Sequence, residues 1–145
     1  ETSGSGTGIM GQKIYIDTNL YISFFEGEAV LSEKVEKILI ESMEKDIQII
    51  VSPLVSMELL FAPLREGQEQ LVNVYKNLKN HITNIVIADF TQKVSEIAAN
   101  IRAKYNLPTP DCIHLATAIE EKVNIFYTAD KAIAKVKEIK VELII

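Results

Sequence analysis

The sequence predicts an α/β fold, a three-layer α/β/α sandwich in which helices cover both faces of a mostly parallel central sheet. Short apolar segments rich in β-branched residues alternate with longer segments whose apolar residues recur every three or four positions. Parallel neighbouring strands need such helical crossovers, which are almost always right-handed. Apolar residues form 48% of the 145-residue chain, which is ample for one compact core.

Five segments are expected to be strands because they are short, apolar and rich in β-branched or aromatic residues. The segment IQIIVS is nearly all apolar, which favours a parallel strand covered on both faces. The predicted strands are residues 13–17, 47–52, 85–87, 124–128 and 141–145.

Helices are expected between these strands. Ser52 and Pro53 have the pattern of an N-cap and a first helical position, and Pro63 should end the helix that they begin. Thr109 with Pro110 repeats this pattern. Asp89 with Gln92 resembles the capping box of another helix. The predicted helical segments are 20–25, 30–43, 53–62, 71–82, 90–105, 110–122 and 132–137.

The first nine residues, ETSGSGTGI, are expected to be a disordered remnant of an expression tag ahead of a native start at Met10. They have neither the basic start nor the apolar stretch of a signal peptide. Residues 10–145 are expected to form a single domain. The longest apolar runs are strand-sized, so no membrane span is predicted. The single cysteine, Cys112, cannot form an internal disulfide, which is compatible with the reducing cytoplasm that we predict.

The net charge of −5 argues against a protein that coats nucleic acid through many Lys and Arg contacts to phosphates. It does not exclude a nuclease. An enzyme that binds divalent cations through clustered carboxylates is negative at its site, and the bound cations reverse the field that a phosphate meets there.

Four acidic residues are expected to share one edge of the sheet. Asp17 ends the first strand and Asp130 follows the fourth, while Asp111 and Glu58 lie near the starts of helices. Ligands of open α/β sheets bind at the carboxyl ends of the strands, where the chain order reverses. Converging carboxylates repel one another by about 1 kcal/mol per pair at 4 Å in water, so protons or cations must neutralise them. An oxygen-only ligand set suits Mg²⁺ or Mn²⁺ better than Zn²⁺.

Each of these residues also has a structural interpretation. Asp111 could complement its helix N-terminus, Asp130 could cap the last helix, and Asp17 could form an Asx turn. His114 lies one helical turn after Asp111, and we expect a hydrogen-bonded core histidine there, not a base or a metal ligand. Cys112 is expected to be a small buried apolar side chain.

Four blocks of the sequence resemble the motif blocks of the PIN-domain family, and the resemblance is closest to VapC-type toxins. The blocks are KIYIDTNLYISFF at 13–25, SPLVSMELLFAP at 52–63, LPTPDCIHLATAIEE at 107–121 and YTAD at 127–130. The resemblance implies a sheet of order 3-2-1-4-5 and a metal-dependent endoribonuclease that hydrolyses RNA with Mg²⁺ or Mn²⁺. In this sequence the residues that match the acidic metal-binding quartet are Asp17, Glu58, Asp111 and Asp130, and those that match its small polar supporting residues are Thr18, Asn19 and Thr128.

The resemblance also bears on the number of metal ions and on partners. Many relatives carry an acidic residue two positions after the fourth carboxylate, where this chain has Ala132, which leaves open whether one or two ions act.

The resemblance also implies a homodimer and, for the toxin of a VapBC-type pair, a cognate antitoxin encoded by an adjacent gene. The apolar residues expected to supply the dimer contact are Tyr21, Phe24, Phe25, Leu60 and Phe61.

Other enzyme classes fit less well. A haloacid-dehalogenase-type phosphatase needs Asp at position 19, and a metal-dependent adhesion domain needs Ser at 19 and 21, where this chain has Asn19 and Tyr21. No glycine-rich phosphate loop follows the first strand. The remaining alternative is a PIN-like noncatalytic scaffold that binds protein or RNA, against which the intact carboxylates argue.

Overall fold

The computed structural model describes residues 11–27 and 29–145, so the predicted tag remnant at 1–9 lies outside the described residues. Within these ranges, five strands form one parallel sheet of order β4-β3-β2-β5-β6. Counted along the chain this is the order 3-2-1-4-5, which confirms the predicted fold. The strands are β2 (Lys13–Ile16), β3 (Gln48–Val51), β4 (Ile85–Ile87), β5 (Ile125–Thr128) and β6 (Val141–Leu143).

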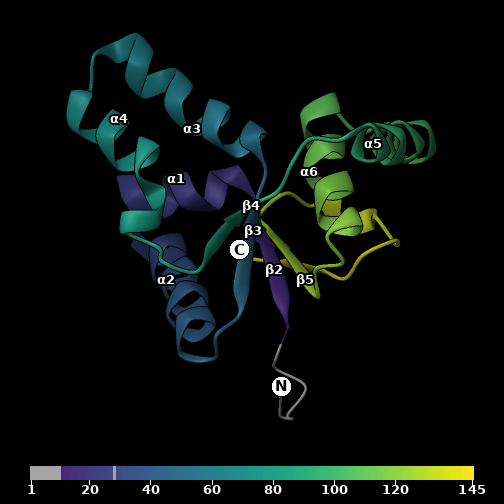
Figure 1. Ribbon diagram of the computed structural model, residues 1–145, viewed down its shortest axis with the longest axis horizontal. Coiled ribbons are helices and arrows are strands. Elements are labelled where there is room, and N and C mark those ends of the chain that lie inside the picture. The colour runs from purple at the N-terminus through teal and green to yellow at the C-terminus, as the bar shows by residue number, and fades with distance from the viewer. Residues whose placement is uncertain (1–10, 28) are drawn as a thin grey trace.

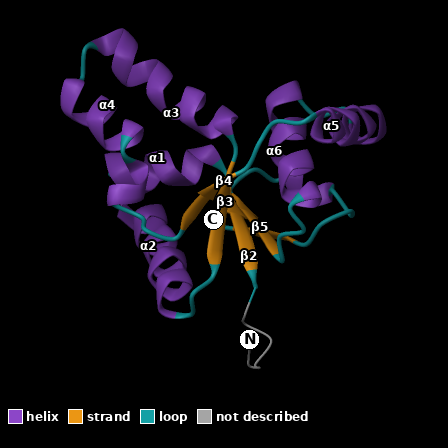
Figure 2. Ribbon diagram, viewed as in Figure 1, coloured by secondary structure: helices purple, strands orange, loops and turns teal. Residues whose placement is uncertain are grey.

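Helices cover both faces of the sheet, with α1 to α4 on one side and α5 and α6 on the other (Figures 1 and 2). Among the described residues, no helix combines the length and the apolar character needed to cross a lipid bilayer. The helices are α1 (Thr18–Glu26), α2 (Ala29–Glu44), α3 (Pro53–Glu66), α4 (Glu69–Lys76), α5 (Gln92–Tyr105) and α6 (Thr109–Glu120), with 3₁₀ turns η1 (Leu78–Asn80) and η2 (Ile133–Lys135).

The strand order reverses between β2 and β5. From β2 the chain steps outward through α1 and α2 to β3, and then through α3 and α4 to β4. It returns through α5 and α6 to place β5 on the other side of β2, so right-handed crossovers put these two helices on the opposite face. Ile16 pairs with Tyr127, so the carboxyl ends of β2 and β5 lie level with each other.

The core is built on strands that are buried from both sides. Residues 14–16 and 49–51 are all at most 5% exposed. The ring of Tyr15 stacks on that of Phe126 with 5.1 Å between centroids. Burial of each large apolar side chain contributes about 1.5 to 3 kcal/mol, which explains why these segments have no polar face.

Pro63 does not end α3, contrary to the prediction. The helix continues through it to Glu66 and ends at Gly67, which has the left-handed backbone conformation with φ of 72°. A proline inside a helix gives up one backbone hydrogen bond. Pro63 is buried at the end of α3, so the packing of its ring offsets this loss.

Two predicted helix starts are also wrong by one or two residues. Helix α5 is capped by Thr91, whose hydroxyl accepts a hydrogen bond from the Val94 backbone N–H at 3.2 Å, and not by Asp89. Thr109 is the first residue of α6 and not its cap. The last predicted helix is only the 3₁₀ turn at Ile133–Lys135. Neighbouring hydroxyl and carboxylate residues compete for the same cap, which sequence spacing alone does not decide.

One member of the predicted dimer contact is wrong. Tyr21 is fully buried in the core and therefore cannot reach a partner. Phe24, Phe25 and Leu60 are partly buried against the core, whereas Phe61 is 60% exposed. The aromatic residues of α1 are thus buried or partly buried, and of the five predicted contact residues Phe61 on α3 is the exposed one.

Candidate functional site

The candidate site lies at the carboxyl ends of β2 and β5, where the strand order reverses. Asp17 directly follows β2 and is the N-cap of α1, while Asp130 comes two residues after β5. The Asp17 backbone N–H donates to the Tyr127 carbonyl oxygen at 2.9 Å. This bond extends the pairing of the two strands by one residue and holds the first carboxylate beside the fourth.

Asp17 is a buried carboxylate with two hydrogen-bond donors. Its Oδ1 accepts from the Thr18 backbone N–H at 2.9 Å and its Oδ2 from the Thr128 hydroxyl at 2.8 Å. Burial raises the pKa of Asp17, and the bonds from Thr128 and Thr18 reduce that rise. The buried Thr128 also accepts from the Asp130 backbone N–H at 3.0 Å, so its hydroxyl links the two strand ends.

Glu58 comes from α3 and is held by one of its two oxygens. Its Oε1 accepts from the Thr18 hydroxyl and from His114 Nε2, each at 2.7 Å. Partial burial raises the pKa of Glu58, but the hydrogen bonds from His114 and Thr18 outweigh it, so the pKa lies below its ordinary value. Glu58 is therefore an ionised carboxylate whose second oxygen, Oε2, accepts no hydrogen bond among the described residues.

Asp111 has the opposite electrostatic environment. It lies in the first turn of α6, is half-buried, and its carboxylate accepts no hydrogen bond within residues 11–27 and 29–145. Burial is the main cause that raises its pKa to about 6, followed by the negative charges of Asp17 and Asp130 and then of Glu58. The charge of each of the other three predicted carboxylates therefore contributes to the raised pKa of Asp111.

The three predicted supporting residues differ in their contacts. Thr18 is buried and bridges two carboxylates, Asp17 through its backbone N–H and Glu58 through its hydroxyl. Thr128 binds Asp17 as described above. Asn19 is exposed on the first turn of α1, and its side chain makes no hydrogen bond to the four carboxylates in the described part of the chain.

The contacts of Asp130 are compatible both with a structural role in the turn after β5 and with the predicted role as a metal ligand. Its side chain is exposed, and its Oδ1 accepts from the Ala132 backbone N–H at 2.9 Å, which closes an Asx turn after β5. Its second oxygen, Oδ2, has no such bond within the described residues. The turn therefore fixes the backbone of Asp130 and leaves one oxygen at the rim of the site.

The donor set suits a hard divalent cation in its chemistry. It offers carboxylate oxygens without thiolate, and the pKa of Asp111 is raised first by burial and then by the negative charges of its neighbours. Across the described residues, however, no three His, Cys, Asp or Glu side chains are arranged around a common point.

His114 is the residue whose contacts sequence reasoning missed. It is 1% exposed and both ring nitrogens have partners, which confirms the predicted hydrogen-bonded core histidine. The same ring, however, contacts Glu58 of the predicted quartet. Its other nitrogen lies 2.6 Å from the hydroxyl of Tyr15, which in turn lies 3.0 Å from Ser52 Oγ. A tyrosine in a strand that is covered on both faces needs a hydrogen-bond partner for its hydroxyl. Tyr15 in the first predicted strand was therefore the sequence signal for a polar partner in the core.

Cys112 is buried, at 1% exposure, which confirms its prediction as a small apolar side chain. Its Sγ lies 3.5 Å from the Leu107 carbonyl oxygen, a weak contact that occupies the thiol. Cys112 therefore belongs to the packing of α6 and not to the carboxylate site.

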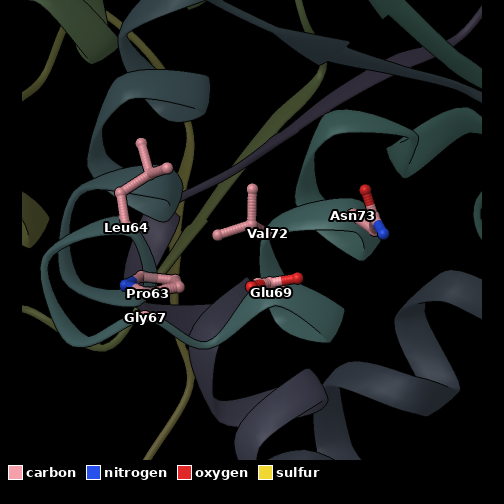
Figure 3. A pocket seen from close by; sticks show the side chains of 6 residues that line it. All are labelled: Pro63, Leu64, Gly67, Glu69, Val72 and Asn73. Atoms are coloured by element: carbon pink, nitrogen blue, oxygen red, sulfur yellow. The ribbon is translucent and has the colours of Figure 1, made fainter.

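Two pockets of the described residues lie along α3. One of about 250 Å³ lies between the end of α3 and the start of α4 (Figure 3), and none of the four carboxylates lines it. Another of about 250 Å³ is apolar and includes Met57 and Ile113, sequence neighbours of Glu58 and Asp111. The carboxylate site is thus an open rim flanked by an apolar hollow.

Replacing Asp111 by Asn is expected to stabilise the metal-free protein at neutral pH. Because the folded-state pKa of about 6 lies above the ordinary value of 3.8, the folded protein keeps a proton that the unfolded chain releases between these values. The free energy of unfolding contributed by this group therefore falls as pH rises through that window. The variant should gain on the order of 1 kcal/mol at neutral pH, after allowance for solvent screening, and nothing below about pH 4.

Urea unfolding in the presence of EDTA, at neutral and at acidic pH, measures this difference. The matched control is Glu120→Gln, which removes an exposed carboxylate from the far end of the same helix and should change the free energy of unfolding by less than about 0.5 kcal/mol. An Asp111→Asn protein that is no more stable than the unmodified protein at neutral pH would contradict the raised pKa that burial and the neighbouring charges give Asp111.

Comparisons with known proteins agree with this fold. The chain is 25% identical to Ribonuclease VapC6 of Methanocaldococcus jannaschii, over 88% of this chain and 95% of the relative. DNA-bound VapBC from Salmonella typhimurium has a TM-score of 0.72 at 17% identity, and the match covers 90% of this chain and 97% of that chain. The sarcin-ricin loop cleaving toxin VapC20 of Mycobacterium tuberculosis has a TM-score of 0.69 at 12% identity, over 88% and 98% of the two chains. The family model described as PIN domain matches residues 14–139, and the chain belongs to this family.

Proposed function

We propose that this protein is a metal-dependent endoribonuclease that hydrolyses phosphodiester bonds of RNA with Mg²⁺ or Mn²⁺. The observation that carries the proposal is the electrostatic coupling of Asp111 to three further carboxylates where the strand order reverses. Such a site needs a cation or a proton for neutrality, and a phosphate can approach it only when a cation is present. The relative named Ribonuclease VapC6 supports the choice of RNA.

In this proposal the four carboxylates hold the cation. Glu58 would offer Oε2, and the oxygens of Asp111 and Asp130 that accept no hydrogen bond among the described residues would complete the set with Asp17. When bound, the cation would lower the pKa of a water molecule and stabilise negative charge on the phosphate. Thr18 and Thr128 would hold the carboxylates in place through the hydrogen bonds described above.

Replacing Asp17 by Asn should remove Mn²⁺ binding and lower RNA cleavage by about a hundredfold or more, because the amide brings no negative charge to the cation. Titration calorimetry of Mn²⁺ measures the binding and its stoichiometry, which distinguishes one ion from two. Cleavage of a pool of structured RNA is followed in parallel, with EDTA as the metal-free reference. Circular dichroism checks that the fold is kept.

The matched control is Asp89→Asn, the same change at an exposed residue that follows β4 on the same edge of the sheet. It should leave both binding and cleavage unchanged. Metal binding by the unmodified protein without cleavage would leave the substrate to be found. Neither binding nor cleavage, even with RNA present, would overturn the proposal in favour of a PIN-like noncatalytic scaffold.

We also propose that the protein forms a homodimer through α3. Met57, Phe61 and Leu64 are 63%, 60% and 56% exposed, and their spacing puts them on one side of the helix. Exposed apolar side chains that are contiguous on a surface mark contacts between proteins. A twofold contact would cover the same patch on both copies.

Changing Phe61 to Lys should convert the dimer to a monomer, because a charge in an apolar contact has no partner there and Arg65 already lies 4.9 Å from the ring centre. Light scattering at micromolar concentration measures the mass. Val30→Lys, at a residue of α2 that is 64% exposed, is the matched control and should remain dimeric. A monomeric unmodified protein would contradict the proposal.

Finally, we propose that the protein is the toxin of a VapBC-type pair. The similar structures include a toxin–antitoxin complex from Klebsiella pneumoniae, at 23% identity and a TM-score of 0.62. A cognate antitoxin would neutralise the site by covering it, and a basic side chain such as Arg would suit the charge of the carboxylates. The toxin and its RNA substrate would meet in the cytoplasm.

The gene of such an antitoxin should lie beside the gene of this protein, and its product should co-purify with the protein and suppress cleavage of the RNA pool. Loss of that suppression when the antitoxin is removed is the measurement. An isolated gene would contradict the role as a toxin, whereas the role as a nuclease would stand.

A further inference from the structure

A buried chain of polar groups leads from the core to Glu58. Tyr15 of β2, Ser52 and His114 are each at most 2% exposed. The Tyr15 hydroxyl lies 3.0 Å from Ser52 Oγ and 2.6 Å from His114 Nδ1, and His114 Nε2 lies 2.7 Å from Glu58 Oε1. A longer contact of 3.4 Å joins His114 Nε2 to Thr18 Oγ1. These hydrogen bonds thus connect β2, the end of β3 and α6 with the carboxylate of Glu58 on α3.

The partners decide which nitrogen of the ring carries hydrogen. An ionised carboxylate can only accept, so His114 Nε2 must donate to Glu58. On the other side of the ring, Nδ1 lies 2.6 Å from the Tyr15 hydroxyl, within hydrogen-bond distance. Burial raises the pKa of Tyr15, so this hydroxyl keeps its hydrogen. It donates to Ser52 Oγ at 3.0 Å, which extends the hydrogen-bonded chain to the end of β3.

These contacts divide the two oxygens of Glu58 between different tasks. Oε1 accepts from both His114 and Thr18, which occupies its two lone pairs. Oε2 accepts no hydrogen bond among the described residues. The Thr18 hydroxyl belongs to a short side chain next to Asp17, whereas His114 reaches Glu58 from α6, the helix that also carries Asp111.

We propose that His114 is a positioning residue that holds Glu58 by Oε1, so that Oε2 alone is presented to the cation. The inference rests on the proposed metal role of Glu58. His114 itself does not contact the cation or the RNA. Because the ring is fixed by Tyr15 on one side and donates on the other, the orientation of Glu58 is set before any cation arrives. Partners that orient a metal ligand typically change metal affinity by about 10- to 100-fold when they are removed.

Two substitutions of His114 separate positioning from packing. The amide nitrogen of Gln lies the same number of bonds from Cα as Nε2 of His, so His114→Gln can still donate to Glu58. The amide of Asn reaches only as far as Nδ1, so His114→Asn keeps a partner for Tyr15 and loses Glu58. Both replace a buried ring by an amide, and urea unfolding reports the packing loss of each.

The metal-free protein and both variants are titrated with Mn²⁺ by calorimetry, and RNA cleavage is measured at saturating Mn²⁺. His114→Asn should weaken Mn²⁺ binding by about tenfold or more, and His114→Gln should recover most of that loss. Tyr15→Phe keeps the stacking on Phe126 and should fall between them, because the His114 ring loses the hydrogen-bond partner of its Nδ1.

The outcomes distinguish this inference from the function on which it rests. A loss in the Asn variant that the Gln variant recovers supports positioning. Mn²⁺ affinities that fall equally in both variants, or that follow only their unfolding free energies, would overturn it and leave His114 as a packing residue. Unchanged affinity in His114→Asn would overturn it as well. No Mn²⁺ binding by the unmodified protein would overturn the proposed function, and this inference with it.

Discussion

The buried carboxylate of Asp17 is the constraint on which the rest of the site depends. A charged group next to the core is costly unless hydrogen bonds replace its water. Here the two donors come from different parts of the chain, the start of α1 and the end of β5. The pairing of β2 with β5, the turn into α1 and the burial of Thr128 must all form together, because each is needed to compensate the same charge.

The remaining carboxylates show how a site can oppose the stability of its own fold. Glu58 is stabilised as an anion by Thr18 and His114, whereas Asp111 is destabilised by its neighbours. The fold tolerates this repulsion because helices and strands pinned by a large apolar core hold the backbone of each residue. Unfavourable charge that is retained at one place on an otherwise well-packed surface is typical of sites that bind an ion.

Sequence reasoning predicted the fold, and the placement of Asp17 and Asp130 after two neighbouring strands, because both depend on local patterns. Strand-like and helical periods gave the alternation, and the position of Asp17 after a strand located the edge of the sheet. Pro63 and Tyr21 were predicted wrongly because tertiary packing decided them: the first is buried within α3, and the second is turned into the core. The link between His114 and Tyr15 spans 99 positions of the sequence, and no local pattern contains it.

Because the sheet is parallel, its first and last strands present opposite ends to the carboxylate edge, so a group attached near one end of the domain lies closer to the site than a group attached near the other. All five strands of the described residues run in one direction, so Lys13 begins β2 at the edge opposite the carboxylates. Strand β6 ends at the near edge, where Leu143 pairs with Thr128 and the Ile144 N–H donates to its carbonyl oxygen at 2.7 Å. A fluorophore, affinity handle or surface tether joined through the amino-terminal side would leave the rim open to a large ligand. The same group on the carboxyl-terminal side would crowd it.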